Sequence, residues 1–114
     1  MNFFEITEYS IDDITALIAN EAEESVHLDF KAAGSLSKDE RKKMEIAKDV
    51  SAFANSDGGI IVYGIEEQNH KAYAISYIDG NTYTKEWLEQ VIQDNIQRKI
   101  EGLQIFPIRD KGDI

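Results

Sequence analysis

The chain has no cysteine, one proline and no long apolar run in its 114 residues. Without cysteine it can form no disulfide framework and no thiolate metal site. No apolar stretch approaches the roughly 20 residues that a helix needs to cross a bilayer. The opening residues, MNFFEITEYSIDD, have no basic segment of the kind that begins a secretory signal. We therefore expect a cytoplasmic protein with no membrane segment.

Basic residues are scarce as well, and their shortage is uneven. The chain holds 12 Lys and Arg against 22 Asp and Glu, a net charge of −10, and residues 1–30 hold no Lys or Arg at all. Because Lys and Arg supply most non-specific affinity for phosphate backbones, such a domain can bind nucleic acid only through a local patch. The candidate basic residues, which could also be solvated helix faces, are Lys38, Arg41, Lys42, Lys43, Arg98 and Lys99.

The length and the helical periodicity define one domain with a single core. Apolar residues at helical spacing predict three helices, at about 10–20, 37–55 and 84–100. Ser10 with Asp13, and Ser37 with Glu40, have the spacing of capping boxes. These pairs predict where the first two helices begin.

Short apolar segments between the helices have the composition of strands. They predict strands at about 25–31, 60–65, 72–78 and 103–108. Residues 66–71 predict a turn, and residues 109–114 resemble a hairpin turn. The order strand–helix–strand allows the first two strands to pair in parallel. The fold class is therefore α+β, with one mixed β-sheet and about three packed helices, and its exposed strand edges allow a homodimer.

The segment ESVHLDFK, residues 24–31, alternates apolar and polar side chains as a half-buried strand does. The side expected to face the core consists of Val26, Leu28 and Phe30. The other side presents His27, Asp29 and Lys31. This polar side is either ordinary solvated surface or part of a site.

Parallel pairing of the first two strands would gather acidic residues at one edge of the sheet. Asp29, Lys31 and Glu66 would lie near that edge, and Glu24 would enter from the preceding turn. The carboxylates of Glu24, Asp29 and Glu66 could bind Mg²⁺ or Mn²⁺. Lys31 would then stabilise charge developing on a phosphate. The alternative is a surface salt bridge between Lys31 and a carboxylate, which contributes little to stability.

Other polar residues have competing explanations. His27 is either a ligand or acid–base group, or a solvated or hydrogen-bonded strand residue. Tyr63 could stack on a base, although a core aromatic is the simpler explanation. The stretch SDGGIIVYG is no phosphate loop, because no Lys follows the glycines and a strand comes next. Nothing in the sequence supports ATP binding.

Two motifs, in this order, resemble the Schlafen Alba-like domain. ESVHLDFK is similar to that family's pattern E-S-x-x-x-E-x-K, and AFANSDGG is similar to its A-F-A-N-T-x-G-G. The family's third pattern is G-V-x-D, and this chain has GIEE in that place. The similarity extends from about Glu24 to Glu67. The resemblance implies a compact α/β domain that occurs in bacterial regulators, helicase-like proteins and defence proteins.

The resemblance also implies a candidate chemistry. In animal Schlafens, related domains cleave structured RNA with three acidic residues and a divalent metal. Carried over by position, these acids resemble Glu24, Asp29 and Glu66, with Glu67 the close rival for the third. Asp29 stands where the family usually has Glu, and Glu66 where it often has Asp, so each carboxylate is displaced by about one methylene.

Three functions are compatible with these observations. The first is a module that binds DNA or RNA within a larger bacterial protein, such as a transcriptional regulator or a defence protein. The second is a metal-dependent nuclease that uses Glu24, Asp29, Lys31 and Glu66 with Mg²⁺ or Mn²⁺. The third is a protein-interaction domain whose acidic N-terminus contacts a basic partner. We expect residues 1–114 to form the N-terminal domain of a longer protein, followed by a further domain.

Overall fold

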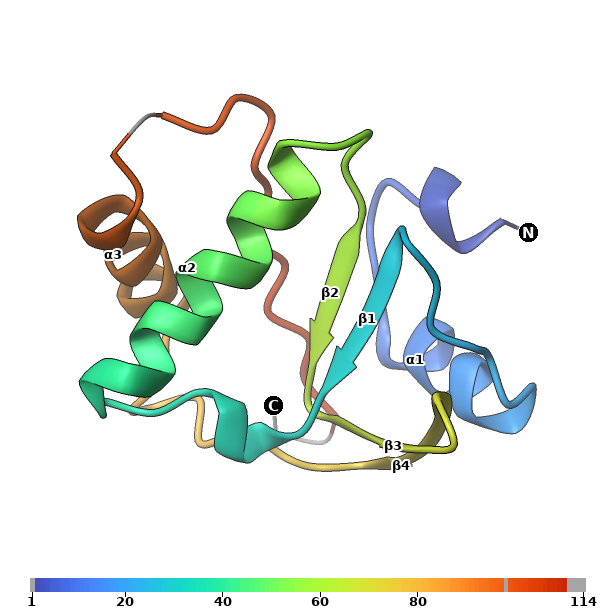
Figure 1. Cartoon of the computed structure of the whole chain (residues 1–114). Helices are drawn as coiled ribbons and strands as arrows, with labels where there is room; N and C mark the ends of the chain where they lie inside the picture. The colour runs from blue at the N-terminus through green and yellow to red at the C-terminus, as the bar shows by residue number, and fades with distance from the viewer. Residues whose placement is uncertain (1, 98, 111–114) are drawn as a thin grey trace.

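A computed structural model describes residues 2–97 and 99–110 and confirms the α+β class (Figure 1). Three α-helices pack on two small sheets. In chain order the elements are η1 (Phe3–Glu5), α1 (Ile11–Ala19), β1 (Leu28–Lys31), η2 (Ala33–Ser35), α2 (Glu40–Ala54), β2 (Ile60–Tyr63), β3 (Ile65–Gln68), β4 (Lys71–Ile75) and α3 (Lys85–Asn95). None of the helices in the described ranges combines the length and the apolar character that crossing a membrane requires.

The strands form two separate sheets and not the single mixed sheet that the sequence predicts. β1 and β2 pair in parallel, as predicted, with Leu28 opposite Ile60 and Lys31 opposite Tyr63. β3 and β4 form an antiparallel hairpin that crosses beneath the carboxyl ends of β1 and β2 (Figure 1). The second sheet thus closes the end of the first, and the polar residues of β1 lie at this corner.

Gly64 forms the corner between the two sheets. Its φ of +109° is one that other residues rarely adopt, and a Cβ there would lie 3.1 Å from the backbone oxygen of Ser76. The Gly64 N–H donates to the Lys31 carbonyl at 2.7 Å, and the Gly64 carbonyl accepts from the Ser76 N–H at 2.8 Å. At this one residue the chain stops pairing with β1 and begins to pair with the segment that follows β4. The predicted strand over 60–65 is broken here.

The turn predicted at 66–71 is shorter than expected. Glu66 and Glu67 belong to β3, and only Asn69 and His70, with φ of 54° and 64°, form the hairpin loop. Two central residues with positive φ are typical of the tight turn that joins twisted antiparallel strands. Asn and His tolerate this conformation better than most side chains do.

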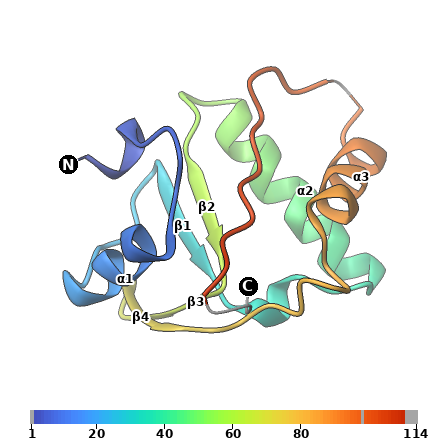
Figure 2. The ribbon, with the colours of Figure 1, turned by 180° about the vertical axis from the view of Figure 1, so that it is seen from behind.

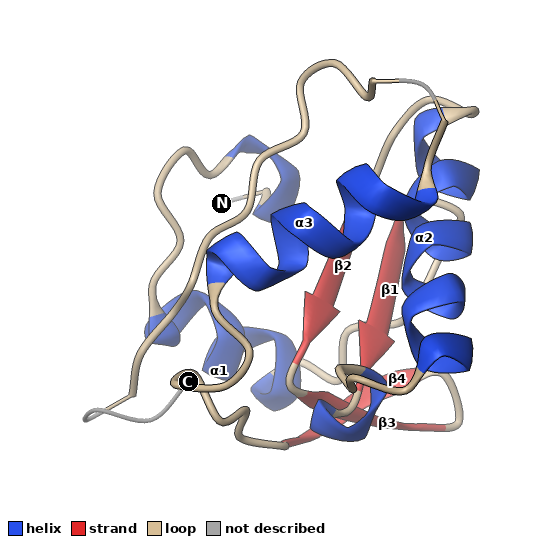
Figure 3. Cartoon of the chain, turned by 90° about the vertical axis from the view of Figure 1, so that its left-hand side faces the viewer, coloured by secondary structure: helices blue, strands red, loops and turns tan. Residues whose placement is uncertain are grey.

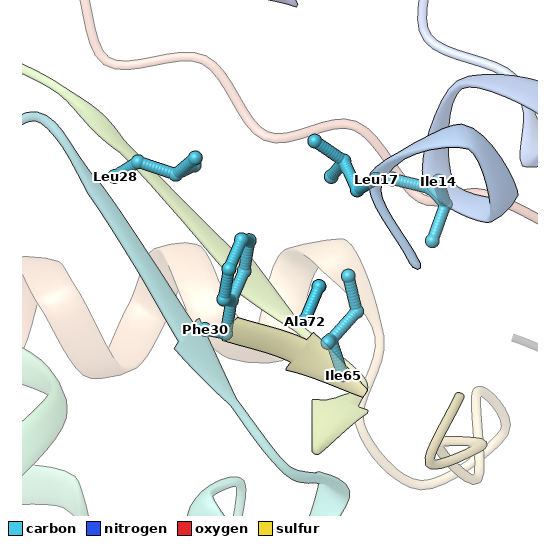
Figure 4. Packing of buried hydrophobic residues seen from close by; sticks show 6 residues of the cluster. All are labelled: Ile14, Leu17, Leu28, Phe30, Ile65 and Ala72. Atoms are coloured by element: carbon cyan, nitrogen blue, oxygen red, sulfur yellow. The ribbon is translucent and has the colours of Figure 1, made fainter. Parts of the chain in front are cut away.

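A first apolar cluster joins α1 to both sheets (Figure 4). Phe30 from β1 and Ile65 from β3 are 2% and 0% exposed and lie at its centre. The helix contributes Ile14 and Leu17, which point toward the strands. The alternation predicted for residues 24–31 holds for Leu28 and Phe30 only. β1 begins at Leu28, so Val26 precedes the strand and is 78% exposed.

A second cluster packs α2 against α3, on the far side of β2 from α1 (Figure 3). Its buried members are Leu36, Ile46, Val91 and Ile92. α2 runs beside the parallel pair (Figure 1).

Helix ends follow the sequence in part. The capping box of Ser10 and Asp13 is confirmed. α2 is capped by Asp39, whose side chain accepts from the N–H of Arg41 at 2.8 Å, so the predicted cap at Ser37 is wrong. Ser37 instead accepts a hydrogen bond from the Asp39 N–H.

α3 begins as predicted, with the Thr84 side chain as its N-cap, but it ends at Asn95 and not near residue 100. Ile96 is already extended, with φ of −121°. The Asn95 side chain donates to the Val91 carbonyl at 2.8 Å and so satisfies an acceptor in the last turn.

The predicted strand at 103–108 is extended but forms no strand ladder with the described residues. It runs past β2 on the face away from β1 (Figure 2), where Ile105 packs on the second cluster and Ile108 on the first. The hairpin turn predicted at 109–114 falls mostly on 111–114, outside the described residues.

Candidate metal centre

Glu24 is held in place by backbone contacts on both sides. Its N–H donates to the His70 carbonyl at 2.7 Å, which ties the segment before β1 to the hairpin loop. Its side-chain Oε2 accepts from the Phe30 N–H at 2.9 Å. The side chain is only 18% exposed. Glu24 therefore enters from the preceding turn, as the sequence predicts, and its carboxylate is fixed at Phe30, near the carboxyl end of β1.

Glu67 and His70 meet Glu24 at the end of the hairpin. Their ligand atoms and that of Glu24 all lie within 4.8 Å of one another. His70 Nδ1 is 3.4 Å from Glu24 Oε1, and the His70 N–H donates to Glu67 Oε2 at 2.7 Å. Two segments that are distant in sequence, the turn before β1 and the β3–β4 hairpin, thus contribute two carboxylates and an imidazole to one place.

Asp29 adjoins this group through Glu24. Burial raises the pKa of Glu24, and a hydrogen bond to Asp29 and the negative charge of Asp29 raise it further. The Phe30 N–H and His70 act in the opposite direction and are outweighed. The two carboxyl groups are therefore close enough to share a proton, and a bound cation would relieve the repulsion between their ionised forms.

Lys31 lies between two carboxylates, one from β1 and one from α2. Its Nζ is 3.3 Å from Asp29 Oδ2 and 3.7 Å from Asp49 Oδ2. Burial disfavours the charged amine, but the charges of Asp29 and Asp49 outweigh burial and raise the pKa of Lys31. The sequence does not single out Asp49, because no pattern within α2 reveals which helix turn faces the end of β1.

The placement of the third predicted acid differs from the prediction. Glu66 and Glu67 are both exposed, and only Glu67 belongs to the group of possible ligands. The predicted strand over 60–65 does not continue to these residues, because the chain turns at Gly64 and β3 is a new strand with its own faces. The sequence does contain a signal that identifies Glu67. The family's G-V-x-D pattern, counted from Gly64, places its acid at this residue.

His27 and Tyr63 do not join the candidate ligands. His27 Nδ1 lies 3.0 Å from the Gly58 carbonyl, so this histidine is a hydrogen-bonded residue at the other end of β1. Tyr63 packs against the second apolar cluster, which agrees with the core explanation. Burial raises the pKa of Tyr63, and the charges of Asp49 and Asp29 add to this effect. Its buried hydroxyl has no hydrogen-bond partner among the described residues.

The raised pKa of Glu24 predicts how a Glu24→Gln variant depends on pH. The folded chain holds this proton more tightly than the unfolded chain, so ionising Glu24 costs stability as the pH rises from about 4.5 through the raised pKa. Glutamine keeps an oxygen for the Phe30 N–H but cannot ionise. We expect the free energy of unfolding of the variant to improve relative to the wild type as the pH rises.

Urea unfolding at a series of pH values measures this difference. Its slope cannot exceed about 1.4 kcal/mol per pH unit, because a single proton is involved. Below the unfolded pKa both forms are neutral at this position and the difference should be constant. A difference that moves toward the wild type with rising pH would contradict the assignment.

These features define a class of protein: an α+β domain with an acidic, histidine-containing cluster where two small sheets meet. The chain belongs to the Schlafen, AlbA_2 family, whose model matches residues 24–113. The match begins at Glu24 itself and leaves the acidic N-terminal segment outside. Searches of curated proteins and of solved structures find no match. The family supports a nucleic-acid-related module and specifies neither substrate nor reaction.

Proposed function

We propose that this domain binds nucleic acid at the corner between the two sheets and cleaves it with a divalent cation. One observation carries the proposal: Glu24, Glu67 and His70 place their ligand atoms within 4.8 Å of one another, although Glu24 is distant in sequence from the hairpin that holds the other two. Asp29 and Lys31 stand directly beside them. A shared surface salt bridge explains Lys31 and Asp29 but does not explain why Glu67 and His70 converge on Glu24.

The donor set fits a hard or borderline divalent cation. Glu24 and Glu67 offer carboxylate oxygens, which Mg²⁺ and Mn²⁺ prefer, and His70 offers a nitrogen that suits Mn²⁺ better than Mg²⁺. The chain has no cysteine that would favour a soft metal. A cation bound by these residues would polarise a phosphate oxygen and favour attack by water.

The chain's own residues supply positioning and charge. The Phe30 N–H fixes one oxygen of Glu24 and leaves the other to the group formed with His70. Lys31 keeps its proton because Asp29 and Asp49 stabilise the charged amine. A phosphate that approaches Lys31 therefore meets a protonated amine, whose charge Asp29 and Asp49 partly offset. Asp49 acts on the substrate only through Lys31, as a positioning residue.

The net charge of −10 limits how nucleic acid can bind. Long-range repulsion disfavours non-specific attachment, so binding depends on the cation, on Lys31 and on local basic residues. The helical candidates for such contacts are Lys38, Arg41, Lys42 and Lys43, near the start of α2. We expect affinity that falls steeply with salt.

Cleavage assays test the proposal directly. Labelled tRNA and labelled single-stranded DNA are incubated with the full chain, with Mn²⁺ or with chelator. The expected result is cleavage that requires the cation and is lost in a Glu24→Gln/Asp29→Asn variant. A Glu5→Gln/Glu8→Gln variant removes the same charge from the exposed N-terminal segment and should cleave as the wild type does.

The other outcomes discriminate between functions. Binding without cleavage under any cation supports a module that only binds nucleic acid, and the catalytic part of the proposal is then rejected. Absence of binding even at low salt, where electrostatic attraction is strongest, rejects both parts.

A further inference from the structure

A shallow groove of about 510 Å³ lies beside the metal centre and contains one exposed aromatic ring. Lys31 and Glu67 line this groove together with Tyr73 of β4. Tyr73 is 57% exposed, and the residues before and after it in the strand are small alanines. The groove therefore joins candidate catalytic groups to a flat apolar surface.

An irregularity in the hairpin lies at Tyr73. Glu66 pairs with Ala74, and the next residue, Glu67, pairs with Ala72, so Tyr73 has no partner in β3. Strand alternation places Tyr73 on the side opposite the buried Ala72, and the ring is therefore exposed. Bulges of this kind are common next to active sites.

The Tyr73 ring is also unused within the described part of the chain. The ring pairs there are formed by Phe3, Phe4, Tyr9, Phe106, Tyr83 and Trp87. Tyr73 stacks on none of them. An exposed ring in a groove that also holds a charged amine is available to a ligand with a π-system and a negative charge.

Resting on the proposed function, we infer that Tyr73 stacks on an unpaired base of single-stranded nucleic acid, whose adjacent phosphate lies at Lys31 and the metal centre. Stacking tolerates every base, because each has a π-face, so the contact selects strand state and not sequence. Bases within a duplex already stack on their neighbours and cannot cover the ring. The substrate class is therefore a single strand or a loop with unstacked bases.

Charge in the groove agrees with this mode of binding. Lys31 is the single cation among the residues lining it, and Glu66 and Glu67 are both acidic. These acidic side chains would repel a phosphate alone, so the affinity must come from the bound divalent cation and from the base. A stacked base supplies attraction that does not depend on charge.

Fluorescence anisotropy with an unstructured, labelled RNA oligonucleotide tests the inference, with Ca²⁺ as a cation that leaves the strand intact. Tyr73→Ala should weaken binding about 5- to 150-fold, the range that one base–aromatic stack contributes. Tyr73→Phe should bind within about twofold of the wild type, because the ring remains. Tyr77→Ala removes a comparably exposed tyrosine outside the groove and should leave affinity unchanged. Binding of the same sequence as a duplex should be insensitive to Tyr73.

A second readout follows stacking itself. An oligonucleotide carrying 2-aminopurine should change fluorescence on binding to the wild type and to Tyr73→Phe, and not on binding to Tyr73→Ala. Unchanged affinity of Tyr73→Ala, equal losses for single strand and duplex, or no binding by the wild type would each overturn the inference. Cleavage by the wild type with unchanged Tyr73→Ala binding rejects stacking alone. Binding that depends on Tyr73 without any cleavage rejects the nuclease alone.

Discussion

Glu67→Gln is expected to reduce metal-dependent cleavage by about 100-fold or more, whereas Glu66→Gln leaves it within about threefold of the wild type. The two residues are neighbours in β3, have the same side chain and lose the same charge. Only Glu67 places an oxygen within 4.8 Å of the ligand atoms of Glu24 and His70. Loss of outer partners of a metal ligand already costs 10- to 100-fold in affinity or activity, so loss of a ligand should cost no less.

Isothermal titration with Mn²⁺ separates binding from chemistry in this pair. The affinity of Glu67→Gln for Mn²⁺ should fall, and that of Glu66→Gln should stay near the wild-type value. Glu66→Gln should also bind nucleic acid slightly more tightly, because it removes a negative charge from the groove. Equal effects of the two substitutions would mean that general electrostatics, and not ligation, explains the acidic corner.

Part of the candidate site could be predicted because it lies on one strand. Asp29 and Lys31 share a face by simple alternation. Glu24 lies an odd number of residues before Asp29, so it could not share that face and had to enter from the turn before. Glu67 and His70 depend on a different kind of information. Their arrival at Glu24 requires the chain to turn at Gly64 and the hairpin loop to bond to the Glu24 N–H. Neither event leaves a periodic pattern in the sequence.

The fold shows the same division between local and distant determinants. Local signals located the three helices, since the apolar stripes and the cap at Ser10 act within a few residues, although the cap of α2 is Asp39 and not Ser37. The parallel pairing of β1 and β2 followed from connectivity and handedness. The split into two sheets did not follow, because an apolar run such as IIVYGI has the same composition whether it continues or bends. Val26 illustrates the limit, since alternation cannot reveal where a strand begins.

The acidic corner lowers the stability of the fold when its carboxyl groups are ionised. Glu24 and Asp29 are held close together with their side chains only 18% and 25% exposed, and burial, the hydrogen bond to Asp29 and the charge of Asp29 raise the pKa of Glu24. A purely structural role would favour a neutral pair at this position. Groups that lower stability and yet are fixed by backbone hydrogen bonds are typical of sites that bind a charged ligand.

Gly64→Ala is expected to lower the free energy of unfolding by about 2–3 kcal/mol and to weaken metal binding together with it. Alanine is strained at a φ of +109°, and its Cβ would approach the Ser76 carbonyl to 3.1 Å. Relief of that contact must move β4 away from Gly64, and the hairpin that carries Glu67 moves with it. Gly34→Ala is the matched control, because nothing lies within 4 Å of its Cβ.

Urea unfolding and Mn²⁺ titration of both glycine variants measure these effects. Gly34→Ala should change the free energy of unfolding by less than about 0.5 kcal/mol and leave Mn²⁺ affinity intact. In Gly64→Ala the affinity for Mn²⁺ should fall even under conditions where the variant is fully folded, because the Phe30 N–H holds the Glu24 carboxylate at β1 while Glu67 follows the hairpin. A folded Gly64→Ala protein that binds Mn²⁺ as the wild type does would mean that the corner does not set the distance between these two carboxylates. The site would then have to be assembled by the hairpin loop and the Glu24 backbone alone.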